Sequence, residues 1–320
     1  MSVVVVNYNG EQFLQNCVDS ILAQSSPPGE VIVVDNHSAD RSLDILRSIS
    51  DVRLTVLPLA DNVGYPAGCN AGIQNSSGDL IAILNNDVVL EPDWLKTLLN
   101  HDSQEWSLWA SRIEFASPPG VIDSAGDGMA VVGSAFKIGH GDPVDLHLET
   151  REVFGPCAAA ALYRRSLLEA VGGFDPDFFL VYEDADLNFR ARLMGFRCLY
   201  VADARVLHGV NTSIGTFTDS YVFHGHRNSE FVFWKNMPAR LLLFYLPERA
   251  LFNLFSLLFF LWKGRGTAFL QAKLGALRER RAITEKRKKI QQDSTVSSRE
   301  VRRHLERNWL KYRRKLAGPS

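Results

Sequence analysis

The stretch Leu80-Ile-Ala-Ile-Leu-Asn-Asn-Asp87 decides the fold of this chain. Its five apolar residues form the uninterrupted run that is typical of a parallel strand buried on both faces. The run stops on two amides and a carboxylate, and polar groups at the carboxyl end of such a strand lie where open α/β sheets bind ligands. A polar turn after a strand would leave the same pattern, so the neighbouring segments must distinguish the two.

The residues before this stretch alternate between strand and helix patterns. Val3 to Val6 and Val31 to Val34 are β-branched runs, and Val52 to Leu57 predicts a further strand. Apolar residues spaced three and four apart in the intervening segments predict helices. Because such alternation implies right-handed crossovers and a mostly parallel sheet, we predict an α/β fold.

Three of the predicted strands end on polar residues: Asn7, Asp35, and Asn85 to Asp87. The carboxyl ends of parallel strands meet at one edge of the sheet, so we expect a ligand site there. The carboxylate of Asp35 could accept a hydrogen bond from a base N–H or from a ribose hydroxyl. The alternative is that Asp35 only forms the turn after its strand. Asp87 suits a hard divalent cation, whose other ligands must come from elsewhere in the chain.

Between Asn62 and Gly72 the chain is rich in glycine and asparagine, which allows close approach of the backbone to a ligand. This segment does not match the GxxxxGK[ST] phosphate loop. No GxGxxG follows the first strand, so a hydride-transfer enzyme has little support in the sequence.

A second group of candidate residues lies past residue 180. Glu183, Asp184 and Asp186 open a predicted helix, and helix capping explains one or two of these acids. The remaining carboxylate could act as a general base that takes a proton from an attacking hydroxyl. His208 ends a predicted strand, where a structural role and a metal-ligand role both stay open.

The composition favours a folded protein of the cytosol. The 320 residues are 46% hydrophobic, enough for a sizeable core. The four cysteines are dispersed without CxxC spacing, as in reduced core positions. No charged segment followed by a cleavable apolar run precedes the first strand, so we expect no secretory signal. Residues 263–320 carry 18 Lys and Arg against 5 Asp and Glu, which indicates contact with an anionic surface or a solvated tail.

Two apolar runs, Leu241 to Leu246 and Leu251 to Trp262, are separated by Pro247-Glu-Arg249. Each is shorter than the roughly 20 residues of a membrane span, so we expect two short helices lying in the membrane interface. Core packing or a homodimer contact is the alternative. The basic residues that follow suit anionic headgroups better than nucleic acid, because base-stacking aromatics are nearly absent there.

Five ordered segments together resemble the family 2 glycosyltransferases of the GT-A fold, and within them the rhamnosyltransferase-like members. The segments are Ser2 to Gly10, Val31 to Asp40, Asn62 to Gly72, Leu80 to Trp94 and Gly173 to His208. The resemblance implies a GT-A domain over residues 1–235, with a mostly parallel sheet flanked by helices. Residues 236–320 are then a helical, membrane-associating extension, apolar first and basic afterwards.

The resemblance also implies roles for individual residues. Asp184, with Glu183, occupies the place of the catalytic acidic pair, and Asp184 is the expected base. Asp87 and His208 are the expected ligands of Mg²⁺ or Mn²⁺. The residues expected to bind the nucleotide and the donor sugar are Asn7, Asn9, Asp35, Asn62, Gly64, Asn70, Asn85 and Asn86. Asn85 departs from the family pattern, because it stands where the DxD motif has its first acid.

The implied reaction is inverting transfer of a sugar, rhamnose or a similar one, from a dTDP- or UDP-linked donor. The expected acceptor is a lipid-linked saccharide or polysaccharide of the cell wall or O-antigen, and the expected location is cytoplasmic, peripheral on the inner face of the cell membrane. A non-catalytic nucleotide-sugar-binding or scaffold subunit is the main alternative. A sugar-phosphate nucleotidyltransferase is less favoured, because its Gly-rich activating loop is missing after the first strand.

Overall fold

The computed structural model describes residues 1–209 and 218–309, which group into two compact units. The first unit comprises Met1–Asp127, Lys137–Phe179 and Phe196–Asn211. The second comprises Gly128–Phe136, Leu180–Gly195 and Thr212–Ser320. The two units therefore interleave along the chain, and the single domain boundary after residue 235 stays a prediction.

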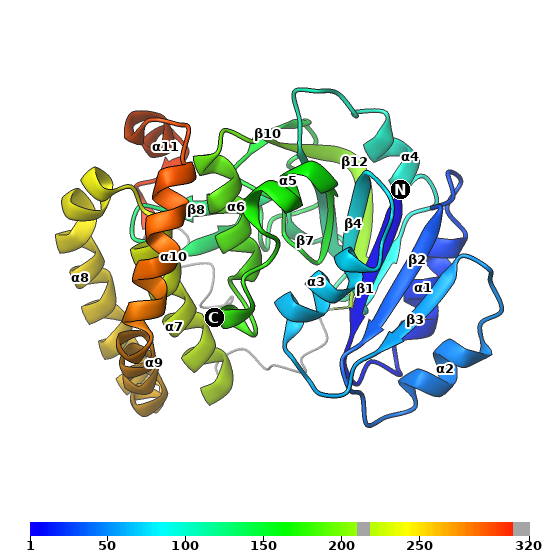
Figure 1. The fold of residues 1–320 in the computed structure, drawn as a ribbon, viewed down its shortest axis with the longest axis horizontal. Helices are drawn as coiled ribbons and strands as arrows, with labels where there is room; N and C mark the ends of the chain where they lie inside the picture. Colours follow the sequence, from blue (N-terminus) through cyan, green and yellow to red (C-terminus); the bar gives the residue numbers. More distant parts are fainter. Residues whose placement is uncertain (210–217, 310–320) are drawn as a thin grey trace. The chain divides into compact units, whose positions relative to one another are not determined.

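The first unit is built on one large sheet with strand order β10-β12-β6-β11-β4-β1-β2-β3 (Figure 1). Its strands are β1 (Ser2–Asn7), β2 (Glu30–Asp35), β3 (Leu54–Pro58), β4 (Leu80–Asn85), β5 (Val88–Leu90), β6 (Leu108–Phe115), β7 (Ile122–Ser124), β10 (Arg151–Val153), β11 (Ala160–Arg164) and β12 (Cys198–His208). Strands β1 to β4 pair in parallel, as their buried apolar runs predict. Strand β11 then pairs antiparallel with β4 and β6.

Strand β12 replaces two strands that the sequence predicts at residues 196–201 and 204–207. It runs parallel to β6, with a register shift between Val201 and Arg205. Polar and small residues at 202–204 read as a break in the sequence, but a bulge absorbs them and the ladder continues to His208.

The helices of the first unit are α1 (Leu14–Leu22), α2 (Ser42–Ser48), α3 (Tyr65–Gln74), α4 (Trp94–Leu99), α5 (Arg165–Val171) and the 3₁₀ turn η1 (Pro176–Phe178). Helix α3 lies very close to β1. A Cβ added at Gly72 would come 2.2 Å from Cγ1 of Val4, so only glycine fits there. A Cβ at Gly68 would likewise come 2.8 Å from Cγ1 of Val6. The four cysteines are buried, as predicted, and form no disulfide within the described residues.

The second unit is mainly helical, with α6 (Glu183–Leu193), α7 (Asp219–Asn236), α8 (Ala239–Trp262), α9 (Gly266–Arg278), α10 (Arg280–Asp293) and α11 (Ser298–Arg303). A short sheet of β13 (Leu305–Glu306), β8 (Asp127–Ala130) and β9 (Ala135–Lys137) accompanies them. Helix α7 packs against α6, α9 and α10 and is central to this unit (Figure 1).

The prediction of two short helices between residues 241 and 262 is wrong. Helix α8 is continuous over 24 residues and includes Pro247. Proline removes one backbone hydrogen bond, but Tyr245 and Arg249 on either side of it are both buried against the unit and hold the helix together. By length and composition alone, α8 is the one described helix that could cross a membrane.

Candidate active site

The polar ends of β1, β2 and β4 meet at one edge of the sheet, as the strand pattern predicts. Asn7 is the link between them, and its side chain is completely buried. Its Nδ2 donates to Oδ1 of Asp35 at 2.9 Å, while its Oδ1 accepts from Nδ2 of Asn86 at 2.7 Å. A Cβ at Gly10 would come 2.0 Å from Asn86 Nδ2, so this packing needs glycine there.

Asp35 is 1% exposed and organises the loop that follows β2. Its Oδ1 accepts from Ser38 Oγ at 2.6 Å, and its Oδ2 accepts from the Ser38 backbone N–H at 3.0 Å. Asn9 joins this loop to the one after β1, since its Oδ1 accepts from the Ala39 N–H at 2.8 Å. Asp35 is therefore a turn residue in this structure, at the same edge where the sequence predicts a nucleotide.

Asn62, Gly64 and Asn70 shape the neighbouring segment. Asn62 Oδ1 accepts from Asn36 Nδ2 and from the Gly64 N–H, each at 3.0 Å. Gly64 has φ 82°, and a Cβ there would come 2.6 Å from the Phe179 carbonyl oxygen. Asn70 bonds both backbone groups of Phe174, accepting at 2.9 Å and donating at 2.7 Å. The amide of Asn70 thus holds the 174 loop.

Asp87 and His208 lie together because β5 and β12 pair antiparallel, with His208 opposite Val88. His208 Nε2 is 3.2 Å from Asp87 Oδ1, and both side chains are buried. The sequence separates these two residues widely, and the sheet brings them together as the resemblance implies. Asn85, whose backbone N–H bonds the Ala159 carbonyl, ends β4 just before them.

Asp123 completes this cluster, and the sequence interpretation missed it. Its Oδ2 lies 2.8 Å from His208 Nδ1, and Lys137 Nζ lies 2.8 Å from both carboxylate oxygens. Burial would raise the pKa of Asp123, but the Lys137 charge and hydrogen bonds from His140 and His208 hold it well below its usual range. A lone acid inside the apolar pattern around residues 121–124 is the available signal in the sequence, and the structure places it on β7.

The charge on His208 follows from these neighbours. Burial alone would lower the pKa of His208, but the hydrogen bonds and charges of Asp123 and Asp87 outweigh burial and raise the pKa to about 9. At neutral pH the imidazolium therefore joins two carboxylates in this structure.

Glu183, Asp184 and Asp186 belong to the second unit, where they open α6 after Tyr182, a residue with φ 71°. Asp186 is completely buried, and its oxygens lie 2.7 Å from Lys235 Nζ and 2.8 Å from Arg190 Nε. Asp184 is only partly buried, and its Oδ1 accepts from the next N–H at 2.7 Å. Asp186 and Asp184 therefore differ in their surroundings: Asp186 is completely buried among ion pairs, whereas Asp184 is only partly buried.

Solved structures share the fold of most of this chain. The mannosyltransferase PcManGT of Pyrobaculum calidifontis, in complex with GDP-Man and Mn²⁺, is similar with a TM-score of 0.53 and 18% identity, covering 86% of each chain. S. aureus TarS 1-349 in complex with UDP is similar with a TM-score of 0.54 and 18% identity, covering 91% of this chain and 90% of that one. The predicted GT-A-like fold is thereby confirmed.

The sequence profile of glycosyl transferase family 2 matches residues 2–172, and the chain belongs to this family. The predicted enzyme class, glycosyltransferase, is confirmed at this level. The O-antigen biosynthesis protein RfbC of Myxococcus xanthus is 30% identical over 67% of this chain but only 17% of its own length. N-acetylglucosaminyl-diphospho-decaprenol L-rhamnosyltransferase of Mycobacterium tuberculosis is 26% identical over 75% of this chain and 88% of its own.

Proposed function

We propose that this protein transfers a sugar from a nucleoside-diphosphate sugar to an acceptor hydroxyl during synthesis of a cell-envelope glycan. The observation that carries the proposal is the convergence of Asn7, Asp35, Asn86, Asp87 and His208 at the carboxyl edge of one sheet. Open α/β folds bind their ligands at this edge. Rhamnose as the sugar is supported by the named rhamnosyltransferase, which aligns with most of its length.

Asp87 and His208 suit a divalent cation, Mg²⁺ or Mn²⁺. Their facing atoms, Oδ1 and Nε2, are 3.2 Å apart, a separation that two ligands of one small cation can adopt once the imidazolium has lost its Nε2 proton. PcManGT and GalNAc-T7, similar in fold, were both solved with Mn²⁺. When bound, the cation offsets negative charge on the leaving diphosphate. Asn85 in place of an acid lowers the local negative charge and thus the expected affinity.

The protein's own residues have separable roles in this proposal. Asp35 receives the base ring, Asn7 holds Asp35 and Asn86 in place, and Asn9, Asn62, Asn85 and Asn86 line the donor side. Asp184 takes the proton of the acceptor hydroxyl as its oxygen bonds to the anomeric carbon, while the bond from that carbon to the diphosphate breaks. Glu183 supports Asp184 at the start of α6. A single displacement of this kind inverts the configuration at the anomeric carbon.

The acceptor in this proposal is a lipid-linked saccharide, reached at the cytoplasmic face of the membrane. Two relatives support it, since one is named for O-antigen biosynthesis and the other for rhamnosyl transfer to a diphospho-decaprenol-linked sugar. The basic C-terminal segment provides the charge for such a location.

Turnover of a donor panel tests the proposal. The purified protein is incubated with dTDP-, UDP- and GDP-linked sugars and Mg²⁺ or Mn²⁺, with water as the sugar acceptor, and released nucleoside diphosphate is measured. A parallel reaction also contains pyrophosphate. We expect release from one donor, with dTDP-rhamnose the leading candidate, and suppression in Asp184→Asn. Binding of a donor without release would favour the non-catalytic subunit, and release of a nucleoside triphosphate from donor and pyrophosphate would favour the nucleotidyltransferase.

A further inference from the structure

Helix α8 has two faces of opposite character. Its buried residues are spaced four, four, three, four and four apart and form one stripe: Leu241, Tyr245, Arg249, Phe252, Ser256 and Phe260. Apart from Arg240 in its first turn, the exposed large side chains of this helix are apolar: Leu243, Phe244, Leu246, Leu251, Leu254, Phe255, Leu258, Leu261 and Trp262. Monomeric soluble proteins rarely leave so many contiguous apolar side chains in water, so this face calls for a partner.

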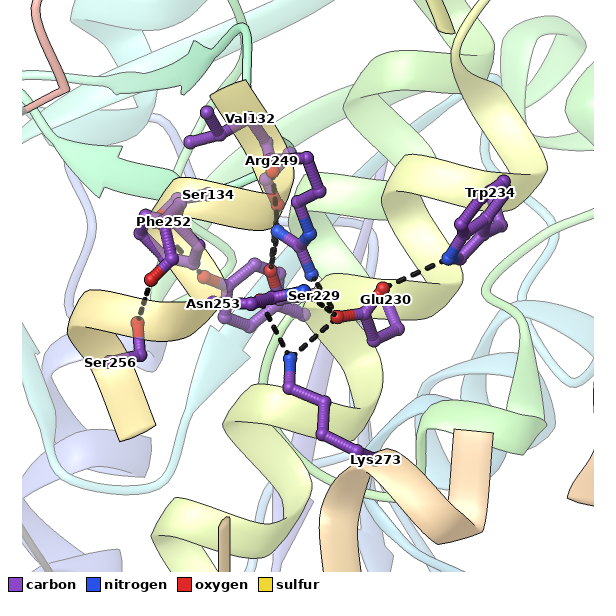
Figure 2. A network of polar contacts seen from close by, with 12 residues as sticks. Val132, Ser134, Ser229, Glu230, Trp234, Arg249, Phe252, Asn253, Ser256 and Lys273 are labelled. Carbon is purple, nitrogen blue, oxygen red and sulfur yellow. Dashed lines mark hydrogen bonds and ion pairs between the residues drawn. The ribbon is translucent and has the colours of Figure 1, made fainter. Parts of the chain in front are cut away.

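The buried stripe is held to the unit by charge as well as by packing (Figure 2). Arg249, near the middle of α8, is 1% exposed and lies 2.8 Å from Glu230 Oε1 on α7. It also donates to Ser229 Oγ at 2.9 Å and to the Val132 carbonyl. Lys273 on α9 reaches the same Glu230 oxygen at 2.5 Å. Because breaking this network would leave buried charges without partners, α8 keeps its stripe on α7 and α9.

This attachment argues against α8 crossing a bilayer. A crossing helix would carry its neighbours with it, and α7 and α9 present His, Arg, Lys and Glu side chains along their length. Charged groups at the centre of a bilayer are costly. An orientation parallel to the surface requires only the exposed face of α8 to enter the membrane.

A basic rim, made of Arg278, Arg280 and Arg281, lies where α9 ends and α10 begins. Leu270, Leu274 and Leu277 are exposed at spacings of four and three, and Leu277 lines a surface hollow together with Arg278, Arg280 and Arg281. At the end of α8, Lys263 Nζ lies 4.4 Å from the ring centroid of Trp262, so another cation adjoins the apolar face. Tryptophan and cations together are typical of the membrane–water interface.

We propose that α8 lies in the plane of an anionic lipid bilayer, with its exposed apolar face among the acyl chains and Arg278, Arg280 and Arg281 on the headgroups. The inference specifies the membrane partner of the proposed function, but its evidence is independent of sugar transfer. An anionic bilayer satisfies both features, the apolar strip and the basic rim. A second copy of the chain would bring the same positive rim instead of negative charge.

Flotation of the full chain with vesicles tests the binding. We expect wild type to float with phosphatidylglycerol-containing vesicles and much less with phosphatidylcholine alone. Leu254→Glu/Leu258→Glu should abolish flotation, whereas Leu146→Glu/Leu148→Glu, at exposed leucines of the first unit, should not. Arg278→Gln/Arg280→Gln/Arg281→Gln should remove the preference for anionic lipid. Equal flotation of wild type and Leu254→Glu/Leu258→Glu, or no flotation of wild type, would overturn the proposal.

Spin labels placed one at a time at Leu243, Leu254 and Leu261 test the orientation. These positions share one side of α8, and a crossing helix would separate the first two in depth by about 16 Å at 1.5 Å per residue. We expect the three labels to show nearly equal immersion by collision with oxygen and with a nickel chelate. A graded depth would mean a crossing helix, and labels shielded in a dimer without vesicles would mean self-association. Either result contradicts the proposal, and neither depends on whether a donor sugar is turned over.

Discussion

His208 Nδ1 lies 2.8 Å from Oδ2 of Asp123, so a buried carboxylate fixes the ring whose other nitrogen faces Asp87. Asp123 is 1% exposed and is itself held by Lys137. Carboxylates behind a histidine ligand set its tautomer and its orientation. The pair therefore prepares the imidazole for the role that the proposed function gives to it.

We predict that Asp123→Asn weakens Mn²⁺ binding by about 10- to 100-fold, the usual effect of losing such a supporting carboxylate. Isothermal titration with Mn²⁺ and a nucleoside diphosphate measures it, and the melting temperature is followed in parallel. Asp142→Asn is the matched control, because Asp142 Oδ2 lies 2.9 Å from His147 in the same unit. Equal Mn²⁺ affinity of wild type and Asp123→Asn would rule out the supporting role.

Two changes at the end of β4 should have opposite effects on the cation. Asp87→Ala removes the expected carboxylate ligand and should abolish the gain in nucleotide affinity that Mn²⁺ provides. Asn85→Asp restores an acid two residues earlier and should raise Mn²⁺ affinity several-fold, since hard cations prefer charged oxygen ligands. Calorimetry with and without Mn²⁺ compares both variants. A cation effect that survives Asp87→Ala unchanged would remove Asp87 from the site.

Substitutions at Asp184 and at Asp186 should affect different properties, catalysis in the first case and stability in the second. Asp184→Asn should retain the wild-type melting temperature and donor affinity but lose transfer, because the base is gone. Asp186→Asn breaks buried pairs with Lys235 and Arg190 and should lower the free energy of unfolding by about 3–5 kcal/mol. Urea denaturation and product formation are measured on both. Wild-type turnover by Asp184→Asn would show that the base has been wrongly assigned.

Glu230→Gln should destabilise the protein in a pH-dependent way. Burial would raise the pKa of Glu230, but Arg249 and Lys273 hold it well below its usual range. Stability from a lowered carboxyl pKa is present above the unfolded-state value of about 4.3 and is lost as pH falls through the folded-state value. The free energies of unfolding of wild type and variant should differ by about 3–5 kcal/mol at pH 7, and this gap should narrow below about pH 4.

Urea denaturation between pH 7 and pH 3 measures this gap. Glu285→Gln is the control, since Glu285 pairs with Lys288 on the surface. A gap that is the same at every pH would mean that the charge of Glu230 does not stabilise the fold.

The sequence pattern predicted the elements whose formation depends on residues close together in the chain. The runs at Val3, Val31 and Leu80 form the parallel strands β1, β2 and β4, because a strand buried on both faces needs apolar residues throughout. From that sheet the meeting of Asn7, Asp35 and Asn86 follows by geometry alone. His208 depended on the resemblance, since only the pairing of β5 with β12 brings it to Asp87.

The features that could not be predicted from the sequence depend on contacts between distant segments. Asp123 gains its meaning from His208 and Lys137, and no spacing along the chain reveals either contact. Pro247 reads as a helix break, but burial of Tyr245 and Arg249 keeps α8 continuous. The acids at 183–186 look alike in sequence, and only the buried partners of Asp186 mark it as structural.

Because β12 lies far along the chain, the residues of the site are synthesised at different times. Asp87 leaves the ribosome early with β4 and β5, but the strand that pairs with β5 and carries His208 is translated much later. Domains generally fold as units as the chain emerges. A product that stops before residue 198 would therefore contain Asp87 without its imidazole, so premature termination would leave a fragment unable to assemble the cluster.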